Sequence, residues 1–236
     1  MRKIYLLMLA GLLLAGCANS TIQRKDGTTS SRAFSVAHLA KTDADILSEL
    51  TQKEVLKSLR TLTEKLYRRN PVEYRKAGHT TVEAASAHLF DQLANWAQTP
   101  LARTNWEEDF RLAFQEGFEG DRVHAFMGAL TGMLMAAYNH KTEFFLLDEL
   151  SAQKLYNSAR NIEVAVWKLS SARTVQGGRF LLSNSMDGEI QNLSFEREFG
   201  KLIAQQDLLA VYVEERTHRT ISRVFQNMTS FVFLPI

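Results

Sequence analysis

The residues best suited to acid–base or metal chemistry are six histidines spread along the chain: His38, His79, His88, His124, His140 and His218. A helical zinc site usually places two histidines four residues apart, as in His-Glu-x-x-His, because this spacing puts both imidazoles on one helix face. No two histidines in the sequence have that spacing. The sequence therefore predicts no metal site.

Histidine can also act with a carboxylate partner, and three such pairs stand three residues apart: Asp121 with His124, His88 with Asp91, and His140 with Glu143. Asp121 precedes a strongly helical stretch, so its simpler role is that of an N-cap, whose side chain accepts a hydrogen bond from a free backbone amide. The other two pairs give the same weak signal. We assign no catalytic residue to any of them.

The sequence contains no motif that would prepare a nucleophile or bind a nucleotide. Gly-x-Ser-x-Gly is absent, and the match of Ser151 and Lys154 to Ser-x-x-Lys is better explained by a helix cap. Neither a phosphate-binding Gly-rich loop nor a dinucleotide fingerprint occurs, so we predict no cofactor. A hydrolase remains an alternative, because histidines far apart in sequence can meet in the folded chain.

Methionines gather in the most apolar stretch downstream of the N-terminus, residues 126–138, which includes Met127, Met133 and Met135. Flexible thioether side chains can line an irregular pocket for an apolar ligand, or fill a core. We favour core filling. Gly128 and Gly132 stand four residues apart in the same stretch, a spacing that lets helices pack closely.

The first seventeen residues have the layout of an export signal. Arg2 and Lys3 precede an apolar run over residues 4–15, and Gly16 and Cys17 follow it. A helix of about a dozen residues, rising ~1.5 Å per residue, falls well short of the ~30 Å hydrocarbon core of a membrane. We therefore expect residues 1–16 to be a signal that is removed.

The run Leu14-Ala15-Gly16-Cys17 resembles the lipobox of bacterial lipoproteins. The resemblance covers about twenty residues. It implies that the Cys17 sulfur carries diacylglycerol through a thioether, that cleavage frees the Cys17 amine, and that this amine is often acylated. Ala18, in place of the aspartate that retains such proteins at the inner membrane, implies an outer-membrane location. The alternatives are an ordinary signal with an unrelated cysteine, or a core cysteine.

Cys17 is the only cysteine, so the mature chain can form no internal disulfide once that residue is lipidated. The chain has 28 basic and 26 acidic residues, and loss of Arg2 and Lys3 with the signal makes the two numbers equal. A protein that neutralises many phosphates needs a clear basic excess. The composition therefore argues against nucleic acid as a partner.

Three regions follow from these features: a signal at 1–16, a lipidated tether at 17–42 and a helical periplasmic domain at 43–236. The tether is rich in small polar residues, which cannot bury enough apolar surface to offset the entropy of ordering. As a coil of about 25 residues, it would hold the domain roughly 25–30 Å from its anchor.

Two helices are expected at the start of the domain. Asp43 is the expected N-cap of a long helix that ends near Arg69, along which leucines and Val55 recur at helical spacing. Asn70 as a cap and Pro71 as the first residue then predict a short helix that ends near Gly78.

Capping boxes predict the next two helix starts. The pattern Thr-x-x-Glu occurs at residues 80–83 and 104–107, where the hydroxyl and the carboxylate each accept a backbone hydrogen bond. Apolar residues then follow at helical spacing, as far as Trp96 from the first box and as far as Phe118 from the second.

The next expected helix begins at the Asp121 cap and ends near His140. It contains the apolar run of residues 126–138. A helix that is hydrophobic on all sides must be surrounded by other elements, so we predict that it is the central helix.

Two more helices are expected beyond it. Ser151 or Asp148 begins one that ends near Ser171, and Ser194 caps another that extends past Phe225. Between them, residues 174–192 lack periodicity and predict either an irregular loop or a short hairpin around 180–182. The apolar tail over residues 231–236 is expected to dock on the body.

These elements predict an all-α fold, with six or seven helices in one domain around the central apolar helix. For function, the anchor and tether favour a non-catalytic helical interaction or scaffold module, held on the outer membrane and facing the periplasm, with other envelope proteins as partners. The alternatives are a carrier or sensor of a small apolar ligand such as a lipid, and an envelope hydrolase.

Overall fold

The computed structural model describes residues 25, 41–91, 93–145, 148–184, 188–190 and 192–217. The chain divides into two units, Met1–Ala40 and Lys41–Ile236, and all the elements below belong to the second. The predictions for Cys17, most of the tether, His38, His218, the extension past Phe225 and the tail lie outside the described residues.

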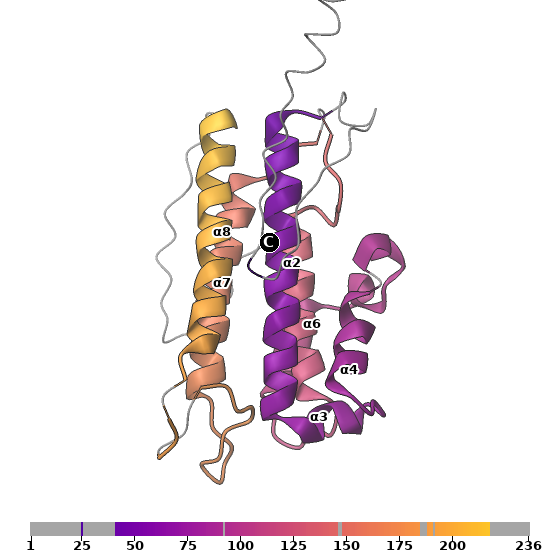
Figure 1. Cartoon of the computed structure of the whole chain (residues 1–236), viewed down its shortest axis with the longest axis vertical. Helices are drawn as coiled ribbons and strands as arrows, with labels where there is room; N and C mark the ends of the chain where they lie inside the picture. The colour runs from indigo at the N-terminus through magenta and orange to yellow at the C-terminus, as the bar shows by residue number, and fades with distance from the viewer. Residues whose placement is uncertain are drawn as a thin grey trace, which may run out of the picture. The chain divides into compact units, whose positions relative to one another are not determined.

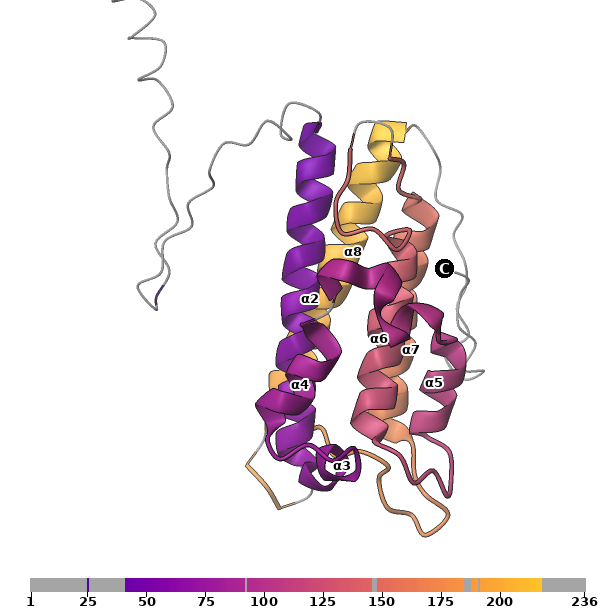
Figure 2. The same ribbon diagram turned by 90° about the vertical axis from the view of Figure 1, so that its right-hand side faces the viewer.

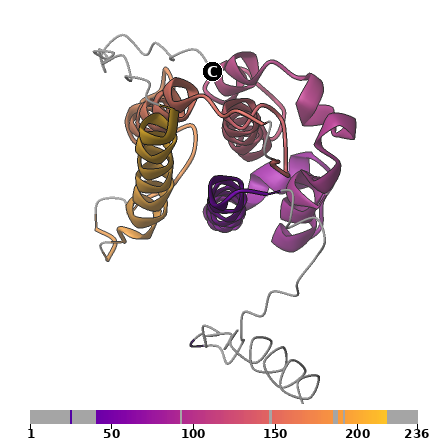
Figure 3. The same cartoon turned by 90° about the horizontal axis from the view of Figure 1, so that it is seen from above.

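Four long helices form the body of the domain: α2 (Asp43–Arg69), α6 (Arg122–Ala137), α7 (Ala152–Ser171) and α8 (Ser194–Thr217). Each packs against two of the others, so that α2, α6, α7 and α8 close a ring (Figures 1 and 3). Neighbours around the ring run antiparallel. For example, Tyr67 near the end of α2 donates a hydrogen bond to Asp121 at the start of α6.

Shorter elements cover the ring beside α2 and α6 (Figure 2). They are the helices α3 (Pro71–Lys76), α4 (Val82–Phe90) and α5 (Trp106–Ala113), with the 3₁₀ helices η2 (Leu93–Gln98) and η3 (Pro100–Arg103). The described residues thus contain seven α-helices and no strand. The prediction of an all-α domain of six or seven helices is confirmed.

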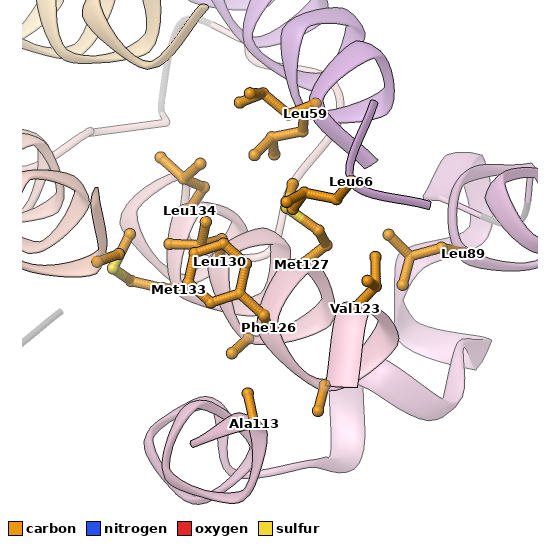
Figure 4. Packing of buried hydrophobic residues seen from close by; sticks show 14 of the residues in the cluster. Leu59, Leu66, Leu89, Ala113, Val123, Phe126, Met127, Leu130, Met133 and Leu134 are labelled. Atoms are coloured by element: carbon orange, nitrogen blue, oxygen red, sulfur yellow. The ribbon is translucent and has the colours of Figure 1, made fainter. Parts of the chain in front are cut away.

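The central position predicted for the apolar helix is also confirmed, because nearly every residue of α6 is buried. Leu59 and Leu66 of α2 pack against it from one side and Ala113 of α5 from another (Figure 4). A Cβ atom at Gly128 would lie 3.1 Å from Leu101 Cδ2, so the missing side chain is what lets η3 approach α6. The prediction that this glycine allows close packing therefore holds.

The cap predicted for α2 was wrong by one residue. Thr42, not Asp43, is the N-cap: its hydroxyl accepts a hydrogen bond from the Asp45 amide, and the Asp45 carboxylate accepts one from the Thr42 amide at 2.7 Å. The reciprocal pair is a capping box in which aspartate takes the place usually held by glutamate. The Thr-x-x-Glu pattern does not include this variant.

Both predicted capping boxes were wrong, although a helix begins close to each. Thr81 caps α4 instead of Thr80, and Glu83 lies 3.6 Å from Arg68 of α2 instead of turning back to the cap. Asn105 caps α5 instead of Thr104, whose hydroxyl donates to Leu101 and closes η3. In each case the cap is the polar residue immediately after the predicted one.

The predicted helices around these caps were also too long. The run expected to reach Trp96 ends as α4 at Phe90 and continues as η2, whose backbone departs from helical angles at Asn95 (φ −111°, ψ 50°). The helix expected to reach Phe118 ends at Ala113. Apolar residues continue at helical spacing beyond the ends of α4 and α5. Trp96 is buried there and Phe118 is partly buried, although neither residue lies in an α-helix.

The end of α6 falls earlier than predicted. The helix stops at Ala137, and Asn139 and His140 adopt left-handed backbone angles (φ 53° and 59°). The His140 amide then donates to the Met135 carbonyl at 2.7 Å, which satisfies a carbonyl that the helix end would leave free. Asparagine tolerates this conformation better than most residues do.

The described part of the loop between α7 and α8 is irregular, which is one of the two predicted alternatives, and residues 180–182 have no strand pairing there. The observed pairing is one isolated bridge between Arg173 and Arg179. The Leu182 backbone is instead held at both its N–H and C=O by the Asn70 side chain, at 2.8 Å each. The same bonds explain why the Asn70 side chain makes no cap for α3.

The two remaining helix starts can be compared with their predictions. Ser151 is the N-cap of α7, as one of the two predicted alternatives. Ser194 was predicted as a cap but is the first residue of α8, and its amide donates to the Asn192 side chain at 3.0 Å. The cap thus comes from an asparagine two residues earlier.

Candidate functional site

Three of the six histidines come together on one side of the domain. His79 lies in the connection from α3 to α4, His88 on α4, and His124 in the first turn of α6. The ring centroids of His79 and His88 are 5.2 Å apart, and those of His88 and His124 are 5.8 Å apart. We call this row of rings the histidine column.

The histidine column has its deepest member at His124. Burial of the ring lowers the pKa of His124, and charge on His88 or His79 would lower it further. The carboxylates of Asp121 and Asp109 act in the opposite direction but do not reverse the shift. The folded chain therefore favours the neutral form of His124.

Both carboxylate oxygens of Asp121 accept structural hydrogen bonds, so Asp121 is not placed to act with His124 in acid–base chemistry. One carboxylate oxygen accepts from the His124 backbone amide at 2.9 Å, and the other accepts from the Tyr67 hydroxyl at 2.8 Å. Burial, together with Asp121, raises the pKa of Tyr67. The predicted N-cap at Asp121 is confirmed, and the carboxylate bonds the His124 backbone rather than its imidazole.

The other two histidine–carboxylate pairs are likewise engaged elsewhere. Asp91 forms an ion pair with Arg60 at 2.9 Å, on the exposed surface of α2. His140 accepts a hydrogen bond at Nδ1 from the Trp96 indole at 2.9 Å, and the two rings stack. Because Nδ1 is the acceptor, the ring proton of neutral His140 is on Nε2. Burial lowers the pKa of His140 as well.

Ser151 and Lys154 also adopt the structural role that was expected of them. The Ser151 hydroxyl accepts from the Lys154 backbone amide at 3.3 Å, which is the bond of an N-cap. The Lys154 ammonium is directed to the Asn139 side chain, at 3.4 Å. Among the described residues, no group of three His, Cys, Asp or Glu side chains is placed to share a metal ion.

The methionines that could have lined a ligand pocket fill the core instead. Met127, Met133 and Met135 are all fully buried. A depression of about 400 Å³ lies elsewhere, between α5 and α7, with Phe110, Phe114 and Val164 in its lining. The sequence offered no signal for this depression, because its residues come from two helical segments about fifty positions apart.

Charged residues of the loop after α7 bind the body of the domain. Arg69 of α2 pairs with Glu189 at 2.8 Å, and Asn184 donates to Glu196 of α8 at 2.7 Å. Arg179 donates to the Ser170 carbonyl at the end of α7. Asp187 lies outside the described residues. These contacts fix the loop at the lower end of the bundle (Figure 1).

An apolar face runs along α8 and α2. Leu208, Val211 and Tyr212 of α8 are 71%, 51% and 36% exposed, and Leu50 of α2 is 47% exposed. Leu50 and Leu208 border a groove of about 210 Å³ between the two helices. In the same groove, the Gln205 Oε1 atom is buried and accepts no hydrogen bond from the described residues. We call Leu50, Leu208, Val211 and Tyr212 the α2/α8 apolar face.

The described residues therefore define an all-α, single-domain protein with a four-helix ring. No protein-family model matches the chain, and searches of curated proteins and of solved structures also found no match. None of the helices among the described residues is both long enough and apolar enough to cross a membrane.

Proposed function

We propose that this chain is a lipid-anchored protein of the bacterial cell envelope whose helical domain acts as a non-catalytic interaction module. The observation that carries the proposal is the order of residues before Cys17: two cations, an apolar run of about a dozen residues, and two small residues. This order suits export, cleavage before Cys17 and lipidation of its sulfur.

Lipidation would fix the location of the domain. Each buried CH₂ contributes ~0.8 kcal/mol, so two or three acyl chains hold a protein on a membrane far more firmly than one does. With Ala18 after the cysteine, the anchor is assigned to the outer membrane, with the domain facing the periplasm. Thr42 caps α2 and Lys41 pairs with Glu49, so the proposed tether is residues 17–40, which would give the domain room to reach partners near the membrane surface.

The α2/α8 apolar face supports the role of an interaction module. Leu208, Val211 and Tyr212 follow the i, i+3, i+4 spacing of one helix face, and Leu50 extends that face across the groove. Contiguous exposed apolar side chains on a soluble domain mark contact sites more often than isolated ones do.

The partner that fits this face is an envelope protein that presents an apolar helix. The groove lies between two antiparallel helices, so a third helix can lay its side chains along it.

The anchor is tested with Cys17→Ser in cells. We expect the wild-type chain to be trimmed before residue 17 and to enter the detergent phase, and the variant to remain untrimmed and unlipidated. Ser20→Ala, three residues past the cysteine, is the matched control and should behave as wild type. A Cys17→Ser chain that is still cleaved at the same bond and still enters detergent would refute the anchor.

The interaction surface is tested separately, with a photo-crosslinking residue at position 211 in cells. Val175 is 86% exposed and lies in the turn after α7, away from the apolar face, so position 175 is the control. We expect an envelope protein to crosslink from 211 and not from 175, and Leu208→Asp to abolish that product. Equal products from both positions, or none from 211, would contradict the proposed surface.

A further inference from the structure

The histidine column joins three elements that are separate in the sequence. His124 belongs to α6 of the central ring, while His88 and His79 belong to α4 and to the connection that precedes it. α4 has nine residues and packs mainly on α2. Leu89, next to His88, lies near Gly128 of α6. The rings of His88 and His124 therefore meet where a short outer helix touches the core helix.

The charged and titratable groups around His124 come from every element near it. α6 contributes Asp121, α5 contributes Asp109, α4 contributes His88, and the α3–α4 connection contributes His79. α2 contributes Tyr67, whose hydroxyl occupies one oxygen of Asp121. Burial and the two neighbouring imidazoles favour neutral His124 over the effect of the two carboxylates.

Separation of α4 from α6 would remove the effects that disfavour the charged form of His124. His124 would gain water and lose His88 and His79 as neighbours, so its pKa would return toward the ordinary value of 6.5. A proton therefore binds the separated state more tightly than the packed one. By linkage, the equilibrium between the packed and separated states shifts toward separation as the pH falls below about 6.5. The shift is complete once the pH is below the lowered pKa of His124 in the packed state.

We propose that the histidine column is a pH-sensitive switch that releases α4 and the α3–α4 connection from α6 in mild acid. At neutral pH the His124 ring is neutral and packs beside the His88 ring, and Leu89 stays on the core. In mild acid, protonation of His124 is favoured by its exposure to water, and the short outer helix is the element that moves. The apolar side of α4 that carries Ala85 and Leu89 is then exposed.

This inference goes beyond the proposed function and does not depend on the lipid anchor. Cys17→Ser protein should show the same switch as the wild-type chain, so failure of the anchor and failure of the switch are distinguishable. The peptides that matter cover residues 82–90, and α7 serves as an internal reference.

The test is amide hydrogen exchange on the full chain at pH 7.5 and pH 5.0, corrected for the intrinsic rate at each pH. We expect the opening constant of α4 to rise several-fold at pH 5.0, while that of α7 changes far less. His124→Gln removes the buried imidazole and should abolish most of the rise, whereas His88→Gln removes the middle ring from an exposed position and should reduce it. His38→Gln, the same change at a histidine of the unit Met1–Ala40, should keep it.

Two results would overturn the switch. One is α4 protection in the wild-type chain that is the same at both pH values. The other is a full rise in the His124→Gln chain, which would assign the pH response to groups outside the column.

Discussion

At the scale of single residues, a buried ion pair near the start of α2 is the most sensitive feature of the domain. The Lys41 ammonium pairs with the Glu49 carboxylate, and the two side chains are 6% and 4% exposed. Glu49 also accepts from the Phe144 amide at 3.0 Å. Removal of the carboxylate would leave a buried cation and a buried amide without this acceptor.

We therefore expect Glu49→Ala to lower the free energy of unfolding by about 3 kcal/mol, as found for broken buried pairs. Urea denaturation followed by circular dichroism measures the change. Glu64→Ala is the control, because Glu64 pairs with Arg68 on an exposed surface and such pairs contribute about 1 kcal/mol or less. Equal losses in the two variants would show that Glu49 is not buried with its partner.

At the scale of elements, α6 depends on one side chain for both its start and its link to α2. Asp121 caps the helix through the His124 amide and accepts from Tyr67 of α2, a residue that is fully buried. Capping bonds contribute about 1 kcal/mol, and a buried hydroxyl without an acceptor costs about 1–3 kcal/mol.

Asp121→Ala is accordingly expected to lower the free energy of unfolding by about 2–4 kcal/mol. Thr81→Ala removes the cap of α4 at an exposed position and should cost about 1 kcal/mol. Thermal and urea denaturation of both variants give the comparison. A loss in Asp121→Ala no larger than that in Thr81→Ala would mean that the bond to Tyr67 contributes nothing.

The helices themselves were predictable from local chemistry, and their exact ends were not. Apolar spacing and proline placed α2, α3 and α6, and Asp121 was the correct cap for α6. The caps at Thr42, Thr81 and Asn105 were missed because several polar residues near each start could serve. Tertiary contacts, such as Arg68 with Glu83, chose among them.

At the scale of the whole molecule, the domain is stable without a disulfide. The chain has one cysteine, at position 17, so no internal disulfide can restrict the unfolded state. The closed ring of α2, α6, α7 and α8 around buried side chains supplies the stabilising surface instead.

A reducing agent should therefore leave the midpoint of thermal unfolding unchanged, which differential scanning fluorimetry with and without dithiothreitol can measure. Protein with an unlipidated Cys17 can still form a disulfide between two chains, visible on a non-reducing gel. Cys17→Ser is the control, and it should show neither a dimer nor a shift. A midpoint that falls with the reducing agent in that variant would contradict the expectation.

By itself, the sequence determined the fold class, the central helix and the expectation of an anchored N-terminus, because these depend on local periodicity and on residues adjacent in the chain. Only the tertiary structure decided that His79, His88 and His124 form one column, and that Leu50 and Leu208 border one groove. These residues are 9 to 158 positions apart, and no spacing rule relates them. Side-chain proximity across elements depends on how the helices pack, and packing is a property of the whole chain.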